Sequence, residues 1–127
     1  MKIHGIGIDI VNINRVKKNL KNKNFETRVF NLIEISKCNG QKNKAHCFAK
    51  RFAAKEAFSK ALGTGISKGI KFNEIIIHNV KSGKPSIRLL FNTKKIVIKL
   101  LKKKKFNIFL SLSDDEPFAV ATVIITL

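Results

Sequence analysis

The sequence predicts an α+β fold, a single domain in which a long central helix packs on mainly antiparallel strands. A length of 127 residues suits one domain with its own core, so we expect residues 1–127 to fold as one unit. The first residues alternate with the period of a strand. An uninterrupted run of helix formers at 45–62 ends at a glycine-rich segment, and strand-like runs follow it.

The elements follow from these patterns in chain order. In the strand predicted at 3–11 the isoleucines face one way, and Gly5, Gly7 and Asp9 face the other. The elements expected next are a helix capped by Asn12 or Asn14, further short helix at 25–38, a polar loop at 40–44, the long helix at 45–62, strands at 74–80 and 86–91 joined by a turn at 81–85, a basic amphipathic helix at 93–105, and strands at 106–113 and 118–125 around 114–117.

Cysteine usage and hydropathy bear on the compartment. Cys38 and Cys47 stand nine residues apart without a CxxC motif, so we expect two ordinary thiols in a reducing compartment. No run reaches the roughly 18 apolar residues of a membrane span. The N-terminal stretch resembles a first strand rather than a signal peptide because it lacks a small-residue cleavage site. A cytoplasmic enzyme or binding protein agrees with these features.

The net charge of +18 permits two interpretations. A basic nucleic-acid-binding module is one, and the lysine run at 102–105 favours it. However, 22 of the 26 basic residues are lysine, and lysine, asparagine, isoleucine and phenylalanine are what AT-rich codons encode. Nucleic-acid readers more often use arginine for bidentate contacts. Charge alone therefore does not decide the function.

Asp9 lies inside an otherwise apolar strand. A carboxylate there costs free energy unless it is paired, hydrogen-bonded or bound to a metal. It can cap the helix that follows, but Gly5 and Gly7 favour a ligand-binding role, since they leave room beside the carboxylate. Asp9 is therefore a candidate metal ligand.

Glu56 and Lys60 lie four residues apart on one face of the long helix. They can form a plain intrahelical ion pair, which contributes only about 0.2–0.5 kcal/mol. The segment from Gly63 to Gly65 has backbone amides that could approach a phosphate, although glycine also commonly ends helices. One Asp and one Glu suit Mg²⁺, which takes one or two carboxylates together with water and phosphate oxygens. With a lysine to neutralise phosphate charge, Asp9, Glu56 and Lys60 form a coherent candidate site.

Two segments carry a family resemblance. Residues 5–11 read GIGIDIV and residues 50–66 read KRFAAKEAFSKALGTGI. Both resemble signatures of the holo-acyl-carrier-protein synthases, which are 4′-phosphopantetheinyl transferases. The turn at 83–85 and the closing hairpin at 112–125 extend the likeness over most of the chain.

The resemblance implies a fold, an activity and partners. The fold is 4′-phosphopantetheinyl transferase-like, and the activity is Mg²⁺-dependent transfer of 4′-phosphopantetheine from coenzyme A to a serine of apo acyl carrier protein. Adenosine 3′,5′-bisphosphate leaves, and the holo carrier serves fatty acid synthesis in the cytoplasm. The resemblance also implies a homotrimer with active sites at subunit interfaces. The hydropathy predicts no membrane partner, and a basic nucleic-acid-binding module is the alternative to the enzyme, with nucleic acid not expected as a partner.

The resemblance also suggests residue roles. The residues matching Asp9 and Glu56 bind Mg²⁺, and the lysine matching Lys60 contacts a phosphate of coenzyme A, so Glu56 and Lys60 are the expected catalytic residues. The general base stays open between Glu56 and a metal-held water. The residues expected to bind coenzyme A are Lys60, Gly63, Gly65, Lys84 and Pro85. Many relatives carry histidine where this chain has Asp114, so no histidine role is carried over.

A basic docking face is expected for an acidic carrier protein. Arg15 is the leading candidate because it lies on the first helix, near Asp9 and off the apolar stripe. It is also one of only 4 arginines in a lysine-rich chain. Arg28, Lys17 and Lys18 could extend the patch. A solvated helix face is the alternative.

Overall fold

The computed structural model of the chain describes residues 1–63 and 69–127. Its elements in chain order are β1 (Ile3–Asn12), α1 (Ile13–Asn19), α2 (Lys23–Val29), α3 (Leu32–Asn39), α4 (Lys44–Leu62), the 3₁₀ turn η1 (Phe72–Glu74), β2 (Ile75–Asn79), β3 (Pro85–Leu89), α5 (Phe91–Leu101), β4 (Asn107–Asp115) and β5 (Phe118–Thr126). Within the described ranges, no helix is long and apolar enough to cross a membrane.

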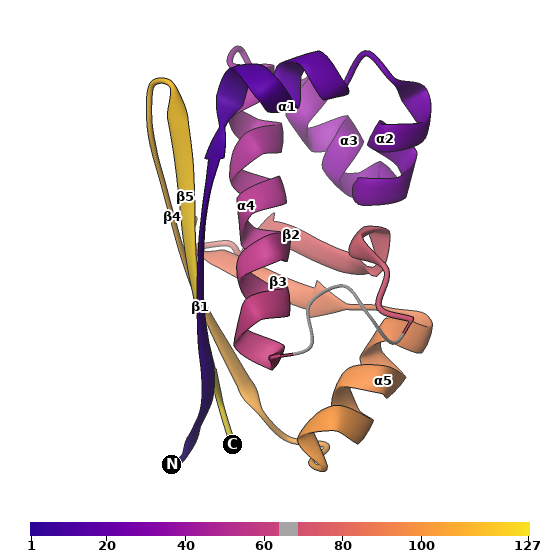
Figure 1. Cartoon of the computed structure of the whole chain (residues 1–127), viewed down its shortest axis with the longest axis vertical. Coiled ribbons are helices and arrows are strands. Elements are labelled where there is room, and N and C mark those ends of the chain that lie inside the picture. The colour runs from indigo at the N-terminus through magenta and orange to yellow at the C-terminus, as the bar shows by residue number, and fades with distance from the viewer. Residues whose placement is uncertain (64–68) are drawn as a thin grey trace.

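Helix α4 lies along one face of a three-stranded antiparallel sheet with strand order β1-β5-β4 (Figure 1). Strands β2 and β3 pair separately as a two-stranded antiparallel sheet on the other side of α4. The short helices α1–α3 gather beside the first half of α4. The predicted α+β class, with a long central helix on mainly antiparallel strands, is confirmed.

Gly5 and Gly7 allow β1 to touch α4 backbone to backbone. A Cβ atom at Gly5 would lie 2.0 Å from the carbonyl oxygen of Ala61, and one at Gly7 would lie 1.9 Å from that of Ala57. Any side chain there would push the strand away from the helix. The expectation that these glycines leave room for a ligand beside Asp9 is therefore wrong, because the helix fills that room.

The opposite face of β1 presents its isoleucines to solvent. Ile6, Ile8 and Ile10 are each about 60% exposed (60%, 60% and 61%), as the predicted alternation requires. No helix of the chain covers this outer face of the sheet (Figure 1) within the described residues. The protomer therefore has one packed and one uncovered apolar face on the same strand.

Three predicted helix boundaries differ from the structure. The stretch 25–38 divides into α2 and α3 because Phe30 is extended and Asn31 caps a new helix. The cap is a capping box: the Asn31 side chain accepts from the amide of Ile33, and the Glu34 side chain accepts from the amide of Asn31. Helix α4 begins at Lys44, inside the predicted loop. Helix α5 ends at Leu101 instead of residue 105, since Lys102 adopts a left-handed conformation.

The cysteines form a disulfide, which corrects the prediction of two free thiols. Cys38 lies in the last turn of α3 and Cys47 in the first part of α4, and their Cα atoms are 5.4 Å apart. The short connection between the helices turns the chain back, so that these two helix ends pack together. The spacing of the cysteines along the sequence does not reveal this reversal, because the sequence predicts a loop between the two helices but not the direction in which the second helix leaves it.

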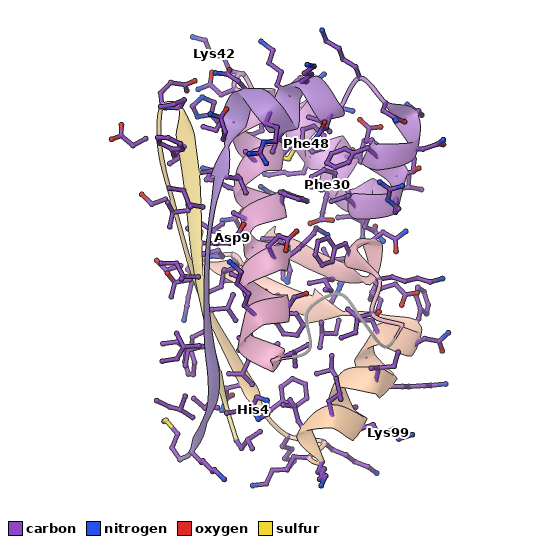
Figure 2. The ribbon with its side chains drawn as sticks, in the orientation of Figure 1. His4, Asp9, Phe30, Lys42, Phe48 and Lys99 are labelled. Atoms are coloured by element: carbon purple, nitrogen blue, oxygen red, sulfur yellow. A yellow bond between two sulfur atoms is a disulfide. The ribbon has the colours of Figure 1, made fainter. Side chains whose placement is uncertain are left out.

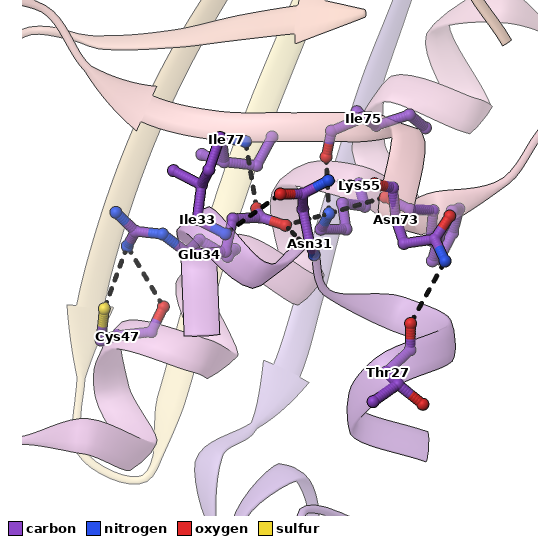
Figure 3. Close-up of polar contacts among 11 residues, drawn as sticks. Thr27, Asn31, Ile33, Glu34, Cys47, Lys55, Asn73, Ile75 and Ile77 are labelled. Carbon is purple, nitrogen blue, oxygen red and sulfur yellow. Dashed lines mark hydrogen bonds and ion pairs between the residues drawn. The ribbon is translucent and has the colours of Figure 1, made fainter. Parts of the chain in front are cut away.

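A buried ion pair joins α3 to α4. The ammonium of Lys55 donates to Oε1 of Glu34 at 2.7 Å and to the carbonyl oxygens of Phe72 and Ile75 at 2.7 and 2.5 Å (Figure 3). The other carboxylate oxygen of Glu34 accepts from the amide of Ile77. Both side chains are fully buried, so this network fixes the segment 72–77 against the helix that carries Glu56.

Candidate active site

Asp9 and Lys60 meet across the contact between β1 and α4. The side chain of Asp9 points toward α4 (Figure 2) because the strand alternation puts it on the same face as the glycines. Its Oδ1 atom accepts from the Lys60 ammonium at 3.0 Å, and the same ammonium donates to the carbonyl oxygen of Ile8 at 3.0 Å. The Lys60 side chain is 54% exposed and that of Asp9 is 16% exposed, so the pair opens to solvent on the lysine side.

Glu56 lies one helical turn before Lys60 and is half-buried. Burial raises the pKa of Glu56, and the negative charge of Asp9 raises it further, while Lys60 opposes both effects. Lys60 makes its ion pair with Asp9 and not with Glu56. The plain intrahelical pair considered from the sequence is therefore not the arrangement found, and the three predicted side chains come together.

The donor set suits a magnesium ion. Burial is the larger cause of the raised pKa of Glu56 and the charge of Asp9 adds to it, so a divalent cation between the two carboxylates would relieve both the burial cost and their repulsion. The part of the chain that the structure describes holds no cluster of three or more His, Cys, Asp and Glu side chains arranged for a metal. A site in which protein side chains fill every coordination position is thus not found among the described residues. Two carboxylates that leave positions for water and phosphate are typical of Mg²⁺.

A cavity of about 600 Å³ opens beside Glu56. Arg28 lies at this cavity too, so the structure places a residue predicted for partner docking next to a predicted catalytic one. The walls of the cavity are mainly apolar and come from α2, α4 and the segment before β2. They are formed by Phe25, Val29, Phe52, Ile70 and Phe72, with Lys71 and Asn73. Such a cavity can take an apolar group next to the carboxylates.

The other predicted residues that the structure describes make no side-chain hydrogen bond or ion pair with the two carboxylates. Gly63 ends α4 in a left-handed conformation, with its amide donating to the carbonyls of the last turn. Gly65 is outside the described residues. Lys84 and Pro85 lie at the β2–β3 turn, and among the described residues no hydrogen bond or ion pair joins them to the carboxylates. Arg15 is exposed on α1, as predicted.

A second, basic pocket was missed by the sequence reasoning. It has a volume of about 280 Å³ and lies between the α3–α4 connection and the tip of the β4–β5 hairpin. Its cationic walls are Lys37, Lys42, Lys50 and Arg51. The available signal was Arg51 itself, an arginine three residues after the buried Phe48 and four before the buried Lys55, on the core side of α4.

His46 closes one side of this basic pocket. Its Nδ1 atom lies 2.6 Å from Oδ2 of Asp114, and its Nε2 atom pairs with Glu116. The hydrogen bond to Asp114 raises the pKa of His46, and the same bond lowers the pKa of Asp114, which also faces Lys50. Asp114 is thus held in an ion-pair cluster that ties the hairpin tip to α4.

The chain is similar to known proteins over nearly its whole length. Residues 5–123 match the family model of the 4′-phosphopantetheinyl transferase superfamily. The chain belongs to this superfamily.

Within the superfamily, the similar proteins are holo-acyl-carrier-protein synthases. One from Pelagibacter ubique is 50% identical over 125 residues, which cover 98% of each chain. A crystal structure of such a synthase from Bacillus anthracis in complex with CoA (3′,5′-ADP) is 36% identical, with a TM-score of 0.80 over 99% of this chain and 98% of that one. The synthase from Neisseria meningitidis is 33% identical, with a TM-score of 0.85 over 98% and 99%. The predicted family is confirmed, and the chain is an enzyme of this group.

Proposed function

We propose that this enzyme transfers 4′-phosphopantetheine from coenzyme A to a serine of apo acyl carrier protein, and that it depends on Mg²⁺ held by Asp9 and Glu56. The observation that supports this most is the convergence of Asp9, Glu56 and Lys60 in a member of this family. The names and bound coenzyme of the similar proteins agree with it.

The chemistry requires positioning and charge neutralisation more than covalent help from the protein. The serine oxygen of the carrier forms a bond to the phosphorus next to pantetheine, and the bond from that phosphorus to the bridging oxygen breaks. Adenosine 3′,5′-bisphosphate leaves with the bridging oxygen and its electron pair. Bound at the two carboxylates, Mg²⁺ would supply Lewis-acid polarisation and orientation of the pyrophosphate.

The side chains of the chain would have separate tasks. Lys60, held beside the carboxylates by Asp9, would place its ammonium against phosphate charge. The serine proton goes either to Glu56 or to a water held by the metal. The general base thus remains open between these two.

We assign the adenosine and phosphate end of coenzyme A to the basic pocket. Arg51 is only 6% exposed, and its Nε atom has no hydrogen-bond partner among the described residues. A buried cation with a free donor favours an anionic ligand. Lys42 and Lys50 add charge at the same place, and the turn carrying Lys84 and Pro85 would complete the coenzyme site together with Gly63 and Gly65.

A homotrimer is part of the proposal. The outer face of the β1-β5-β4 sheet exposes a row of apolar side chains, Ile3, Ile6, Ile8, Ile10, Phe109 and Phe118. Soluble proteins seldom leave such contiguous patches uncovered. Assembly through this face would bury these side chains, and we expect the active sites to lie at the subunit interfaces. Light scattering on the purified protein measures the assembly.

The carrier would dock on α1 and α2. Arg15 is exposed on α1, and Arg28 lies at the apolar cavity beside Glu56. An acidic carrier would meet a positive face there, with Lys17 and Lys18 extending it. The holo carrier would then serve fatty acid synthesis, and the enzyme would act in the cytoplasm.

The direct test is incubation with coenzyme A, Mg²⁺ and an apo carrier protein, followed by mass spectrometry of the carrier. The expected result is a mass gain of one phosphopantetheine that disappears when EDTA is present or when the carrier serine is replaced by alanine. A carrier whose mass does not change under any of these conditions would contradict the proposal. Tight duplex DNA binding at physiological salt that competes with the carrier would favour a nucleic-acid role instead.

A further inference from the structure

The Cys38–Cys47 disulfide lies at the wall of the basic pocket. Cys47 lines that pocket and keeps 7% of its surface exposed, whereas Cys38 is fully buried behind it. Of the two cysteines, Cys47 is therefore the one nearer to a thiol reagent that enters the pocket. The pair stands in contact with a binding surface and not at a remote part of the fold.

Arg51 makes its only side-chain hydrogen bonds in the described structure to Cys47. The Nη1 atom donates to the carbonyl oxygen of Cys47 at 3.4 Å and to its Sγ atom at 3.2 Å, shown by the two dashed lines at Cys47 in Figure 3. Its Nε atom has no partner, and no carboxylate forms an ion pair with Arg51 among the described residues. The guanidinium is thus oriented by one residue, and that residue is half of a disulfide.

We propose that Cys38 and Cys47 are a redox-sensitive pair that controls how strongly Arg51 binds a phosphate of coenzyme A, with the oxidised form binding more tightly. The proposal rests on the proposed function for the identity of the anion. Cys47 acts as a positioning residue, because it works through Arg51.

The change in redox state is a two-electron exchange with a dithiol. A thiolate of the dithiol attacks Sγ of Cys47 and forms a mixed disulfide, and Cys38 leaves as a thiolate that takes up a proton. The second thiol of the reagent then displaces Cys47, so the reagent becomes a disulfide. The protein gains two electrons, together with one proton where Cys47 stays a thiolate and a second proton where Cys47 is protonated.

Reduction changes what Arg51 contacts. In the disulfide, Sγ of Cys47 is a neutral and weak acceptor. As a thiolate it would be an anion 3.2 Å from the guanidinium. The start of α4 and the ammonium groups of Lys37, Lys42 and Lys50 would favour this anion. Asp114 and His46 also line the pocket. The thiolate then competes with the phosphate for Arg51 and adds one negative charge to the pocket.

The coupling is reciprocal by thermodynamic linkage. If the oxidised enzyme binds coenzyme A more tightly, bound coenzyme A must stabilise the disulfide by the same factor. A tenfold difference in affinity corresponds to a shift of about 30 mV in the midpoint potential of the pair. This shift is a measurement that needs no catalytic turnover.

The experiment compares coenzyme A binding by calorimetry in the oxidised enzyme and in the enzyme reduced with dithiothreitol, at pH 8.5 or so to favour the thiolate. We expect the affinity to fall roughly fivefold or more on reduction. Labelling of free thiols, followed by mass spectrometry, gives the midpoint potential with and without coenzyme A, and we expect it to be more negative with the ligand. Equal affinities in the two states, or equal midpoints, would overturn the proposal.

Two variants separate the thiolate from loss of the cross-link. Cys38→Ala leaves Cys47 as the single thiol and should bind coenzyme A as weakly as the reduced enzyme. The double variant Cys38→Ala/Cys47→Ala lacks both the cross-link and the thiolate and should retain most of the oxidised affinity. If both variants lose affinity equally, the disulfide acts only by bracing the fold, and the proposed contact is wrong.

A failure of the proposed function is distinguishable from a failure of this inference. If coenzyme A binds in neither state, the proposed function fails. The Cys47–Arg51 contact is then judged by the thiol pKa of Cys47 in Cys38→Ala, measured from thiolate absorbance. We expect Arg51→Gln to raise that pKa, and an unchanged value would overturn the inference independently of coenzyme A.

Discussion

The ammonium of Lys60 lies 3.0 Å from Oδ1 of Asp9, and this contact joins the last turn of α4 to the middle of β1. It also keeps a cation beside the repulsive pair formed by Asp9 and Glu56. A lysine in this place can serve phosphate binding without being needed for folding, which leads to the first prediction.

Lys60→Ala should weaken coenzyme A binding more than it weakens the fold. The exposed ion pair contributes less than about 1 kcal/mol to stability, while the loss of one charged hydrogen bond to phosphate should raise the KM for coenzyme A about tenfold or more. Steady-state kinetics and thermal melting measure the two effects, with Lys99→Ala on α5 as the matched control. A sharp fall in melting temperature with an unchanged KM would make Lys60 structural.

Asp9→Asn and Glu56→Gln should each lower Mg²⁺-dependent transfer by more than about a hundredfold, since both remove a negative oxygen ligand while keeping the shape of the side chain. The variants should still fold. The measurement is the mass gain of the carrier over a series of Mg²⁺ concentrations. Asp115→Asn, an exposed acid at the end of β4, is the control. Full activity of either variant at modest Mg²⁺ would remove the metal assignment.

Arg15→Glu should raise the KM for the carrier roughly three- to tenfold and leave that for coenzyme A nearly unchanged. The wild-type rate should also fall with added salt, because charge attraction is screened over about 8 Å at physiological ionic strength. Lys99→Glu makes the same change in net charge on another face and should have little effect. Identical carrier kinetics in Arg15→Glu would place the interface elsewhere.

Gly7→Ala should destabilise the protein by about 2–4 kcal/mol, because the new methyl group meets a backbone carbonyl that cannot rotate away. Gly40→Ala is the matched control, since a Cβ there would lie 3.6 Å from the nearest atom, the carbonyl oxygen of Lys37. Chemical denaturation measures both. Equal stability of the two variants would contradict the close contact between β1 and α4.

The ion pair between His46 and Asp114 should stabilise the fold within a limited pH range. The pKa of His46 is raised above its ordinary 6.5, so its contribution is complete below pH 6.5 and is lost as the pH rises through the raised value. The pKa of Asp114 is lowered below its ordinary 3.8, so its contribution is complete above pH 3.8 and is lost as the pH falls through the lowered value.

The difference in melting temperature between the wild type and His46→Gln should therefore be largest between pH 3.8 and 6.5. It should shrink above this range as His46 loses its proton. His78→Gln is the control, because His78 has no ion pair among the described residues. A difference that does not change with pH would show that His46 acts by packing alone.

The carboxylate–lysine site could be predicted because Asp9 lies in a segment with the two-residue alternation of a strand, and Glu56 and Lys60 lie in a segment with the spacing of a helix. Asp9 had to face inward with the glycines of the strand, and Glu56 and Lys60 had to share a helix face. The basic pocket was beyond such reasoning, since Lys42, Arg51 and Asp114 come from three separate segments that only the fold brings together. The disulfide was missed for the same reason, because two helices had to reverse direction before the cysteines could meet.

The role of Gly5 and Gly7 was mistaken for a more specific reason. A glycine next to a carboxylate leaves space, but the sequence does not tell whether a ligand or another backbone fills it. The carbonyl oxygens of Ala57 and Ala61 fill it here. The small residues on α4 were the available signal, since alanines recur at the positions where that helix meets the strand.

The glycine contact also affects how the protein can diverge in evolution. Where two backbones touch, their separation is set by van der Waals contact between backbone atoms and does not depend on the volume of a side chain at that point. Exchanges among isoleucine, phenylalanine and leucine elsewhere in the core can therefore accumulate without changing the spacing of Asp9 from Glu56. A lineage under strong mutational pressure on its composition can lose most of its ancestral core residues and still keep the same active-site geometry, as long as Gly5 and Gly7 remain.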